Sequence, residues 1–241
     1  MYHWFQGGWN FIKQALFPKL CLGCRQHGTY ACPTCLTKLS FTKQLKCPNC
    51  HKPSLLGQFC AKCQKDTLYL NGLWPAQNYA HPLIKQLIKT FKYEGVWEIN
   101  DILSQFLVAT LFNYQLPPPW HQVPLTSWFI TPIPLAKRKQ RQRGFNQAEL
   151  MARQLAQLTN LPFETTLIRQ RPTPKQSRLT NYWRQTNLTE AFCLTDQAQP
   201  SGKIYILVDD VYTSGATLNA GAKVLKQAGA LEVWGLTVAK G

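Results

Sequence analysis

Beyond about residue 65, apolar residues follow two patterns that alternate along the chain. Some segments repeat them every three to four positions, as amphipathic helices do, and others are short continuous apolar runs typical of buried strands. The helical pattern covers residues 81–93, 97–112, 146–158 and 217–228, and the strand pattern covers residues 128–133, 204–208 and 233–238, with a shorter strand near 167–168. Because strands and helices alternate and the strands are apolar throughout, the sequence predicts a parallel α/β sheet.

The helix expected at residues 81–93 has two distinct faces. The apolar face holds Ile84, Leu87, Ile88 and Phe91. The opposite face holds Lys85, Lys89 and Lys92. These lysines either form a solvated helix face or contact an anion, and the sequence leaves both readings open.

The connections are polar or rich in proline. Residues 113–125 contain several prolines and favour an irregular connection, and residues 134–144 are expected to form a loop. Gly229 follows the last helical segment at the position of a C-terminal cap. No stretch approaches the roughly 18–20 apolar residues of a membrane span, and the N-terminus lacks the pattern of a secretory signal. We therefore expect a cytoplasmic protein without a membrane span.

Eight of the nine cysteines of the 241-residue chain form four C-x₂-C pairs near the N-terminus. Two such pairs make a closed Cys₄ site, so four pairs predict two structural Zn²⁺ ions in a module over residues 1–66, followed by a larger domain over 67–241. Sequential sharing is the simplest arrangement, although the spacing also permits an interleaved one. It assigns one ion to Cys21, Cys24, Cys32 and Cys35, and the other to Cys47, Cys50, Cys60 and Cys63. Cys193 stands apart and is expected to be a small buried residue.

The net charge of +16 remains strongly positive even after eight thiolates and two zinc ions lower it by four. The charge is concentrated in residues 1–65, 137–143 and 165–189, none of which contains an acidic residue. Such unneutralised segments favour a polyanionic partner, namely nucleic acid, a phosphorylated ligand or an anionic membrane, over a surface that is basic for solubility alone.

The most informative stretch is ILVDDVYTSGATL at residues 206–218. An apolar strand ends near Asp209 and Asp210, and a turn of small residues leads directly into a helix, where backbone N–H groups and hydroxyls can hold a phosphate. The phosphate-binding residues expected in this turn are Thr213, Ser214, Gly215, Ala216 and Thr217. Two adjacent carboxylates can accept hydrogen bonds from the vicinal hydroxyls of a ribose, so the stretch predicts a sugar 5-phosphate site.

This stretch resembles the signature of type I phosphoribosyltransferases. The resemblance implies that Asp209 and Asp210 hold the ribose of phosphoribosyl pyrophosphate, with Mg²⁺ as a possible companion, and that the following turn holds the 5-phosphate. A separate loop binds pyrophosphate in that family, and the segment with Arg138, Arg141, Arg143 and Gly144 is the candidate here. Residues 170–178 could supply a mobile loop, with Lys175 or Arg178 reaching the ligand.

A closer resemblance covers residues 21–217. The four cysteine pairs, FKYEG, RGFNQ at residues 143–147, and a pattern through Gln176, Leu179, Arg184 and Asn187 are similar to the ComF/GntX group. The resemblance implies a role in natural transformation or DNA use, through the handling of single-stranded DNA beside a helicase-like competence protein. Phe145, Tyr182 and Trp183 are candidate stacking residues for such DNA. The residues expected to bind either pyrophosphate or DNA are Arg138, Arg141, Arg143, Gly144, Lys175, Arg178 and Arg184.

Three functions remain open from the sequence. The first is a DNA-handling protein whose phosphoribosyl site binds phosphoribosyl pyrophosphate or a related nucleotide. The second is an active phosphoribosyltransferase, whose acceptor the sequence does not identify. The third is an adaptor whose zinc module docks a helicase-like partner.

Overall fold

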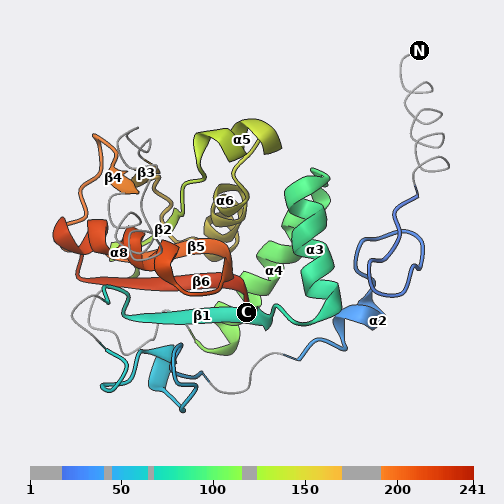
Figure 1. Ribbon diagram of the computed structural model, residues 1–241, viewed down its shortest axis with the longest axis horizontal. Coiled ribbons are helices and arrows are strands. Elements are labelled where there is room, and N and C mark those ends of the chain that lie inside the picture. Colours follow the sequence, from blue (N-terminus) through green and yellow to red (C-terminus); the bar gives the residue numbers. More distant parts are fainter. Residues whose placement is uncertain (1–17, 41–44, 65–67, 116–123, 170–190) are drawn as a thin grey trace, which may run out of the picture.

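A computed structural model of the chain describes residues 18–40, 45–64, 68–115, 124–169 and 191–241. Within these residues, the centre of the fold is a parallel sheet whose strands have the order β1-β6-β5-β2 (Figure 1). The strands are β1 (Gly72–Asn78), β2 (Trp128–Pro132), β5 (Ile204–Tyr212) and β6 (Glu232–Lys240). The parallel α/β fold predicted from the sequence is confirmed.

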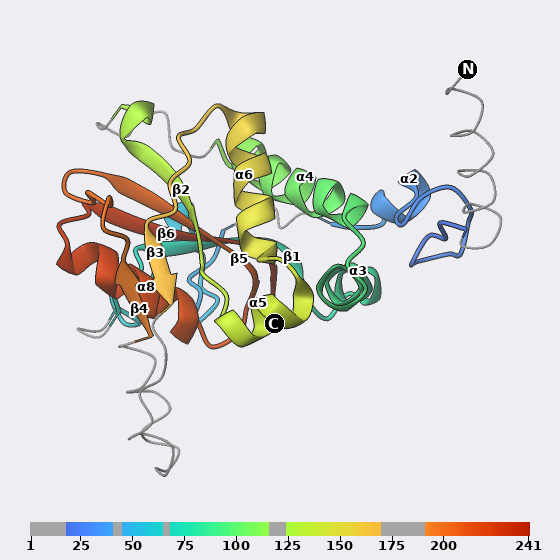
Figure 2. The same cartoon turned by 90° about the horizontal axis from the view of Figure 1, so that it is seen from above.

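Helices cover both faces of this sheet (Figure 2). One face packs against α3 (Pro82–Tyr93), α4 (Glu98–Asn113) and α6 (Gln147–Thr159), and the other packs against α8 (Ala216–Gln227). Alternate residues of β5 serve the two sides: Ile204 and Ile206 belong to the first core, while Tyr205 and Leu207 belong to the second. The central parts of the strands are mostly apolar because both of their faces are buried.

The secondary structure differs from the prediction in two places. Residues Lys137–Arg143 form a helix, α5, where a loop was expected, because Lys, Arg and Gln favour helices and Gly144 ends the helix with a φ of 82°. The strand β1 was missed because Pro75 interrupts its apolar run, but an edge strand tolerates proline. Gly229, with a φ of 90°, follows the C-cap of α8 as expected.

The short strand expected near residues 167–168 lies outside the parallel sheet. β3 (Leu167–Arg169) pairs in antiparallel fashion with β4 (Phe192–Leu194) beside α8. Cys193 lies in β4 and is partly exposed rather than buried, because it alternates with the buried Phe192. Short 3₁₀ turns at Leu55–Gly57 and Leu125–Ser127 complete the described elements.

The two cysteine clusters lie at different places on the sheet domain (Figure 1). The first includes the short helix α2 (Pro33–Leu36) and packs against the start of α3, where Cys32 and Cys35 share a buried core with Leu83. The second packs near the ends of β1 and β6, where Cys47 and Phe59 share a core with Leu73. The expected boundary at residue 66 falls outside the described residues and stays a prediction.

Within the described residues, every helix is too short or too polar to cross a membrane.

Candidate functional site: a phosphate loop, an acid pair and a basic helix

The loop between β5 and α8 forms a small concave pocket. Asp209 and Val211 through Leu218 line it, and these include each turn residue proposed for phosphate binding. The Ser214 hydroxyl accepts a hydrogen bond from the Ala216 N–H at 3.4 Å, and the first N–H groups of α8 face outward at this helix end. The pocket has about 20 Å³ of free space, little more than one water molecule requires, so a phosphate would lie at its mouth and the rest of a ligand outside it. A phosphate seated here would also benefit from the dipole of α8.

Gly215 is required in this loop for two reasons. Its φ is 75°, in the left-handed region, and a Cβ at this position would lie 2.5 Å from the hydroxyl oxygen of the buried Tyr212. Gly202 provides a matched comparison because its φ is also 75° but its surroundings are open.

We expect Gly215→Ala to destabilise the fold more than Gly202→Ala. Backbone strain should cost each variant about 1–2 kcal/mol, and the collision with Tyr212 should add to the cost at residue 215 alone. Urea unfolding of both variants measures the difference, and titration with ribose 5-phosphate should show weaker binding for Gly215→Ala alone. Equal stability and unchanged ribose 5-phosphate binding for the two variants would contradict this account of the loop.

The acid pair lies on β5 immediately before the phosphate loop. The Asp210 N–H donates to Asp209 Oδ1 at 2.8 Å, and Asp210 Oδ1 accepts from the Lys92 ammonium group at 2.7 Å. Lys92 and Asp210 are both largely buried, with 19% and 15% of their side chains exposed. The third lysine of the polar face of α3 therefore contacts an anion of the protein itself, whereas Lys85 and Lys89 are exposed.

Asp209 is the more perturbed of the two acids. Burial, and after it the negative charge of Asp210, raises the pKa of Asp209 to about 7. The N–H of Asp210 and the charges of Lys92 and Arg169 oppose this rise. Near neutral pH the pair can therefore both donate and accept hydrogen bonds, which fits a ligand with two neighbouring hydroxyl groups.

The RGFNQ motif sets the position of the basic helix α5. Gly144 ends α5, Phe145 is buried against Phe91 and Trp97, and Asn146 caps α6 through its side chain, which accepts from the Ala148 N–H at 3.2 Å. Asn146 also donates to the Ile133 carbonyl oxygen at 3.0 Å, which fixes the end of β2. Arg143 donates to Gln147 at 3.1 Å, and its guanidinium lies 5.2 Å from the ring centre of Tyr93.

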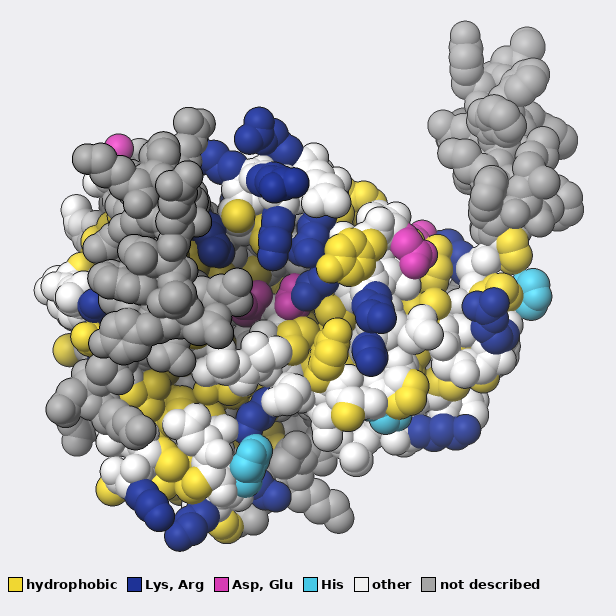
Figure 3. Space-filling view, in the orientation of Figure 1, with side chains coloured by type: hydrophobic (Ala, Val, Ile, Leu, Met, Phe, Trp, Pro, Cys, Tyr) yellow, Lys and Arg dark blue, Asp and Glu magenta, His cyan; other side chains and the backbone are white. Residues whose placement is uncertain are grey.

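Lysines and arginines of α5 and α3 gather on the face that carries the acid pair (Figure 3). On α5, Lys137, Arg138, Lys139 and Arg141 are exposed, and Arg143 is partly exposed. An open depression of about 500 Å³ is lined by Lys137, Gln140, Arg141 and Gly144. The structure thus brings the basic segment to the face that holds the acid pair, but on a helix and not on a loop.

Phe145 is not available for stacking on DNA, because only 7% of its surface is exposed. Lys175, Arg178, Tyr182, Trp183 and Arg184 lie outside the described residues, so their proposed roles stay predictions.

Sequence reasoning missed three functional candidates, Tyr93, Trp97 and Arg169, and left open whether Lys92 contacts an anion. Tyr93 and Trp97 are 70% and 58% exposed, and both contact the RGF segment. Lys92 and Arg169 place positive charge beside the acid pair. FKYEG, which contributed to the family resemblance, contains both Tyr93 and Lys92 and was the available signal for those two. No comparable signal marked Trp97 or Arg169.

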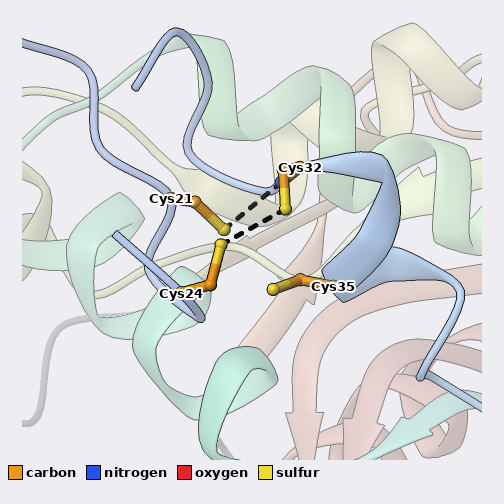
Figure 4. Close-up of side chains that lie close together, drawn as sticks. All are labelled: Cys21, Cys24, Cys32 and Cys35. Atoms are coloured by element: carbon orange, nitrogen blue, oxygen red, sulfur yellow. Dashed lines mark hydrogen bonds between the residues drawn. The ribbon is translucent and has the colours of Figure 1, made fainter. Parts of the chain in front are cut away.

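The four thiols of each expected set converge. Figure 4 shows the first set, Cys21, Cys24, Cys32 and Cys35. In both clusters the sulfur atoms lie within 4.8 Å of one another, and Cys24–Cys32 and Cys50–Cys60 approach to 3.5 Å. Metal–sulfur bonds of about 2.3 Å place tetrahedral sulfurs about 3.8 Å apart, so a small movement around a divalent ion fits both sets. The sequential grouping of the cysteines, rather than an interleaved one, is therefore confirmed.

Backbone groups prepare one thiol of each cluster for ionisation. Burial acts to raise the pKa of Cys21 and Cys47, but N–H groups of the surrounding turns outweigh it and lower each pKa to about 6. The Cys32 N–H donates to Cys21 Sγ at 3.3 Å, and the Cys60 N–H donates to Cys47 Sγ at 3.4 Å. A thiolate held by N–H groups in this way is suited to bind a metal ion.

Known proteins with similar sequences are named competence proteins or DNA utilization proteins. The chain is 32% identical over 205 residues to competence protein ComFC of Bacillus subtilis, covering 82% of this chain and 78% of that protein. It is 30% identical over 226 residues to competence protein F of Haemophilus influenzae, covering 86% of this chain and 96% of that protein. The chain belongs to the ComF/GntX family. The DNA utilization protein YhgH of Escherichia coli is 29% identical over 230 residues, covering 90% and 96%.

Two further comparisons add little to the ComF/GntX assignment. No protein-family model matches the chain. Solved structures that align with it include glutamine phosphoribosylpyrophosphate amidotransferase from B. subtilis, with a TM-score of 0.37, 18% identity and coverage of 58% of this chain and 26% of that one. Adenine phosphoribosyltransferase from Saccharomyces cerevisiae aligns with a TM-score of 0.36, 17% identity and coverage of 57% and 68%. These scores are low, and no functional argument rests on them.

Proposed function

We propose that this ComF/GntX protein handles single-stranded DNA in the cytoplasm. It would bind phosphoribosyl pyrophosphate or a related sugar phosphate, with or without Mg²⁺, at the acid pair and phosphate loop. Each cysteine cluster would hold one structural Zn²⁺, since four thiolates leave no coordination position for a catalytic water.

The observation that carries the DNA proposal is the surface formed by α3 and α5, named here the α3–α5 surface. It combines exposed cations at Lys85, Lys89 and along α5 with the exposed rings of Tyr93 and Trp97. Proteins that bind single strands combine a basic track for the backbone with aromatic platforms for the bases. The cation–π contact of Arg143 with Tyr93 and the packing of Trp97 on Phe145 hold both rings in place, so less entropy is lost when a base stacks on them.

Acidic groups offset only part of this basic surface. Glu94 is exposed beside Tyr93 and accepts from the Thr90 hydroxyl at 3.3 Å. Glu98 instead forms an ion pair with Lys19, and Asp210 forms one with Lys92. The exposed lysines and arginines of α5 contribute the surplus positive charge, which is available to phosphate groups.

We expect replacement of the exposed rings to weaken DNA binding. Tyr93→Leu and Trp97→Leu should each lower the affinity for an oligothymidine by about 5- to 150-fold, because each stacked base contributes about 1–3 kcal/mol. Fluorescence anisotropy with a labelled oligonucleotide measures the change. Phe112→Leu is the matched control: Phe112 is also exposed, at 68%, but lies about 22 Å farther along α4 at 1.5 Å per residue. An equal loss for all three variants would count against a stacking site at Tyr93 and Trp97.

The same assay tests the basic helix through its salt dependence. Arg138→Ala combined with Arg141→Ala should reduce the slope of log affinity against log salt by roughly 0.7 for each DNA phosphate that the variant no longer neutralises. Arg153→Ala on α6, whose guanidinium pairs with Glu149, should leave the slope unchanged. Competition by phosphoribosyl pyrophosphate, with and without Mg²⁺, would place the DNA near the acid pair. If the wild-type protein did not bind the oligonucleotide at low salt, the DNA proposal would be wrong.

An active phosphoribosyltransferase is the second candidate, and the intact acid pair beside the phosphate loop favours it. The reaction would release pyrophosphate when an acceptor displaces it from phosphoribosyl pyrophosphate. Pyrophosphate release that depends on an added acceptor, and that is lost in Asp209→Asn, would support this candidate.

The third function is an adaptor for a helicase-like competence protein. It would require cysteine variants to lose that partner while retaining sugar-phosphate binding.

A further inference from the structure

A cavity of about 510 Å³ lies between the second cysteine cluster and the ends of β1 and β6. Its volume falls within the range of about 300–1,000 Å³ that is typical of small-molecule sites. One wall belongs to the cysteine module, with Leu45, Lys46 and Pro48, and the opposite wall belongs to the sheet, with Leu73 and Pro75. The apolar residues on the two walls leave room for a flat, weakly polar group between them.

Gln77 is an unexplained polar group in this cavity. Its side chain lines the cavity from β1, the residue is only 6% exposed, and its Nε2 lacks a hydrogen-bond partner among the described residues. An unpaired buried donor destabilises the fold, so a ligand atom that accepts this hydrogen bond would recover stability. Ring nitrogens and carbonyl oxygens of nucleobases are such acceptors.

The cavity also carries positive charge. Lys46 and Lys240 line it, and the Lys240 ammonium group donates to the Pro48 carbonyl oxygen at 2.6 Å. That bond joins the end of β6 to the loop of the second cysteine cluster. The cysteine module thus supplies one wall of the cavity and a contact that holds this wall against the sheet.

The cavity and the phosphate loop share a boundary. The Gly241 N–H, on the cavity side, donates at 2.9 Å to the carbonyl oxygen of Tyr212, which lines the phosphate pocket. Lys240 and Tyr212 are also paired in the register of β6 and β5. One ligand could therefore place a phosphate in the loop and a flat ring in the cavity.

We propose that this cavity binds the base of a nucleoside 5′-phosphate, with Gln77 Nε2 donating to the base and the second cysteine cluster forming the wall above it. The inference rests on the proposed sugar-phosphate site and extends it. The nucleoside 5′-phosphate can come from two sources: a free nucleotide, or the 5′-phosphorylated end of a DNA strand.

Calorimetric titration of the full chain with ribose 5-phosphate and with AMP tests the proposal. We expect AMP to bind at least about tenfold more tightly, because its base would be buried between the apolar walls and would gain one hydrogen bond. Gln77→Leu should weaken AMP binding about three- to tenfold, the worth of one hydrogen bond, and leave ribose 5-phosphate binding unchanged. The leucine removes an unpaired amide at similar volume, so the thermal midpoint should hold or rise.

A lysine pair provides the matched control. Lys46 and Lys52 are both exposed near the second cysteine cluster, but only Lys46 lines the cavity. Lys46→Ala should weaken AMP binding, and Lys52→Ala should not. Oligonucleotides with a 5′-phosphate or a 5′-hydroxyl distinguish the two sources: a Gln77-dependent preference for the 5′-phosphate identifies a DNA end, and its absence alongside tight AMP binding identifies a free nucleotide.

Two outcomes would overturn the inference, and they are distinguishable. Equal affinity of the wild-type protein for AMP and ribose 5-phosphate would exclude base binding in the cavity but would leave the proposed sugar-phosphate site unaffected. Absence of binding by either ligand would overturn that site and the inference together, while DNA binding on the α3–α5 surface would still be measured separately.

Discussion

Replacing Cys47 by serine is expected to remove one metal ion per chain and to unfold the segment around the second cysteine cluster. Cys47 is completely buried, accepts the Cys60 N–H at 3.4 Å, and has its pKa lowered to about 6 in spite of burial. A serine hydroxyl does not ionise in this range and cannot replace the thiolate. Structural zinc contributes about 10–16 kcal/mol in small zinc modules, which exceeds what the apolar contacts of this short segment can supply.

Metal content per chain and thermal unfolding measure this effect. The wild-type protein should carry two zinc ions, and Cys47→Ser should carry one and unfold at a lower temperature. Cys193→Ser is the control, since Cys193 lies in β4 outside both clusters and is partly exposed. Two bound ions in Cys47→Ser, or equal losses in both variants, would contradict the assignment of Cys47 as a ligand.

The parts of the fold that were predictable from the sequence depend on local chemistry. The central parts of β2, β5 and β6 are mostly apolar because both faces are buried, and that pattern is visible without a partner. The cysteine sets were predictable because two nearby C-x₂-C turns can close a site by themselves. The phosphate loop was predictable because glycine and small residues follow a buried strand and precede a helix.

The parts that escaped prediction depend on contacts between distant segments or on competing local signals. Lys92 and Asp210 are 118 positions apart, and nothing in the lysine pattern of α3 distinguishes Lys92 from the exposed Lys85 and Lys89. Phe145 was considered for stacking because it follows Arg143, but tertiary packing against Phe91 buries it. The exposed rings lie instead at Tyr93 and Trp97, beside the loop between α3 and α4.

Asp209 should show opposite effects on stability and on binding. Its pKa rises from 3.8 to about 7 on folding, first through burial and then through the charge of Asp210. Between pH of about 4 and about 7 the unfolded chain has lost this proton while the folded chain retains it, so the free energy of unfolding falls as pH rises through that window. Asparagine cannot ionise, and Asp209→Asn should therefore be more stable than the wild-type protein at pH 8 and equal to it below about pH 4.

The same substitution should weaken sugar-phosphate binding by about 10- to 150-fold, because a hydrogen bond to a charged carboxylate contributes about 1.5–3 kcal/mol. Thermal unfolding from pH 4 to pH 8 and titration with ribose 5-phosphate measure the two effects, with the exposed Asp196→Asn as the control for loss of one acid. Higher stability with weaker binding would show that Asp209 lowers the free energy of unfolding while it raises the affinity for the ligand. Lower stability at pH 8 would instead mean that Asp209 is ionised and held by Lys92 and Arg169, and that the acid pair serves the fold.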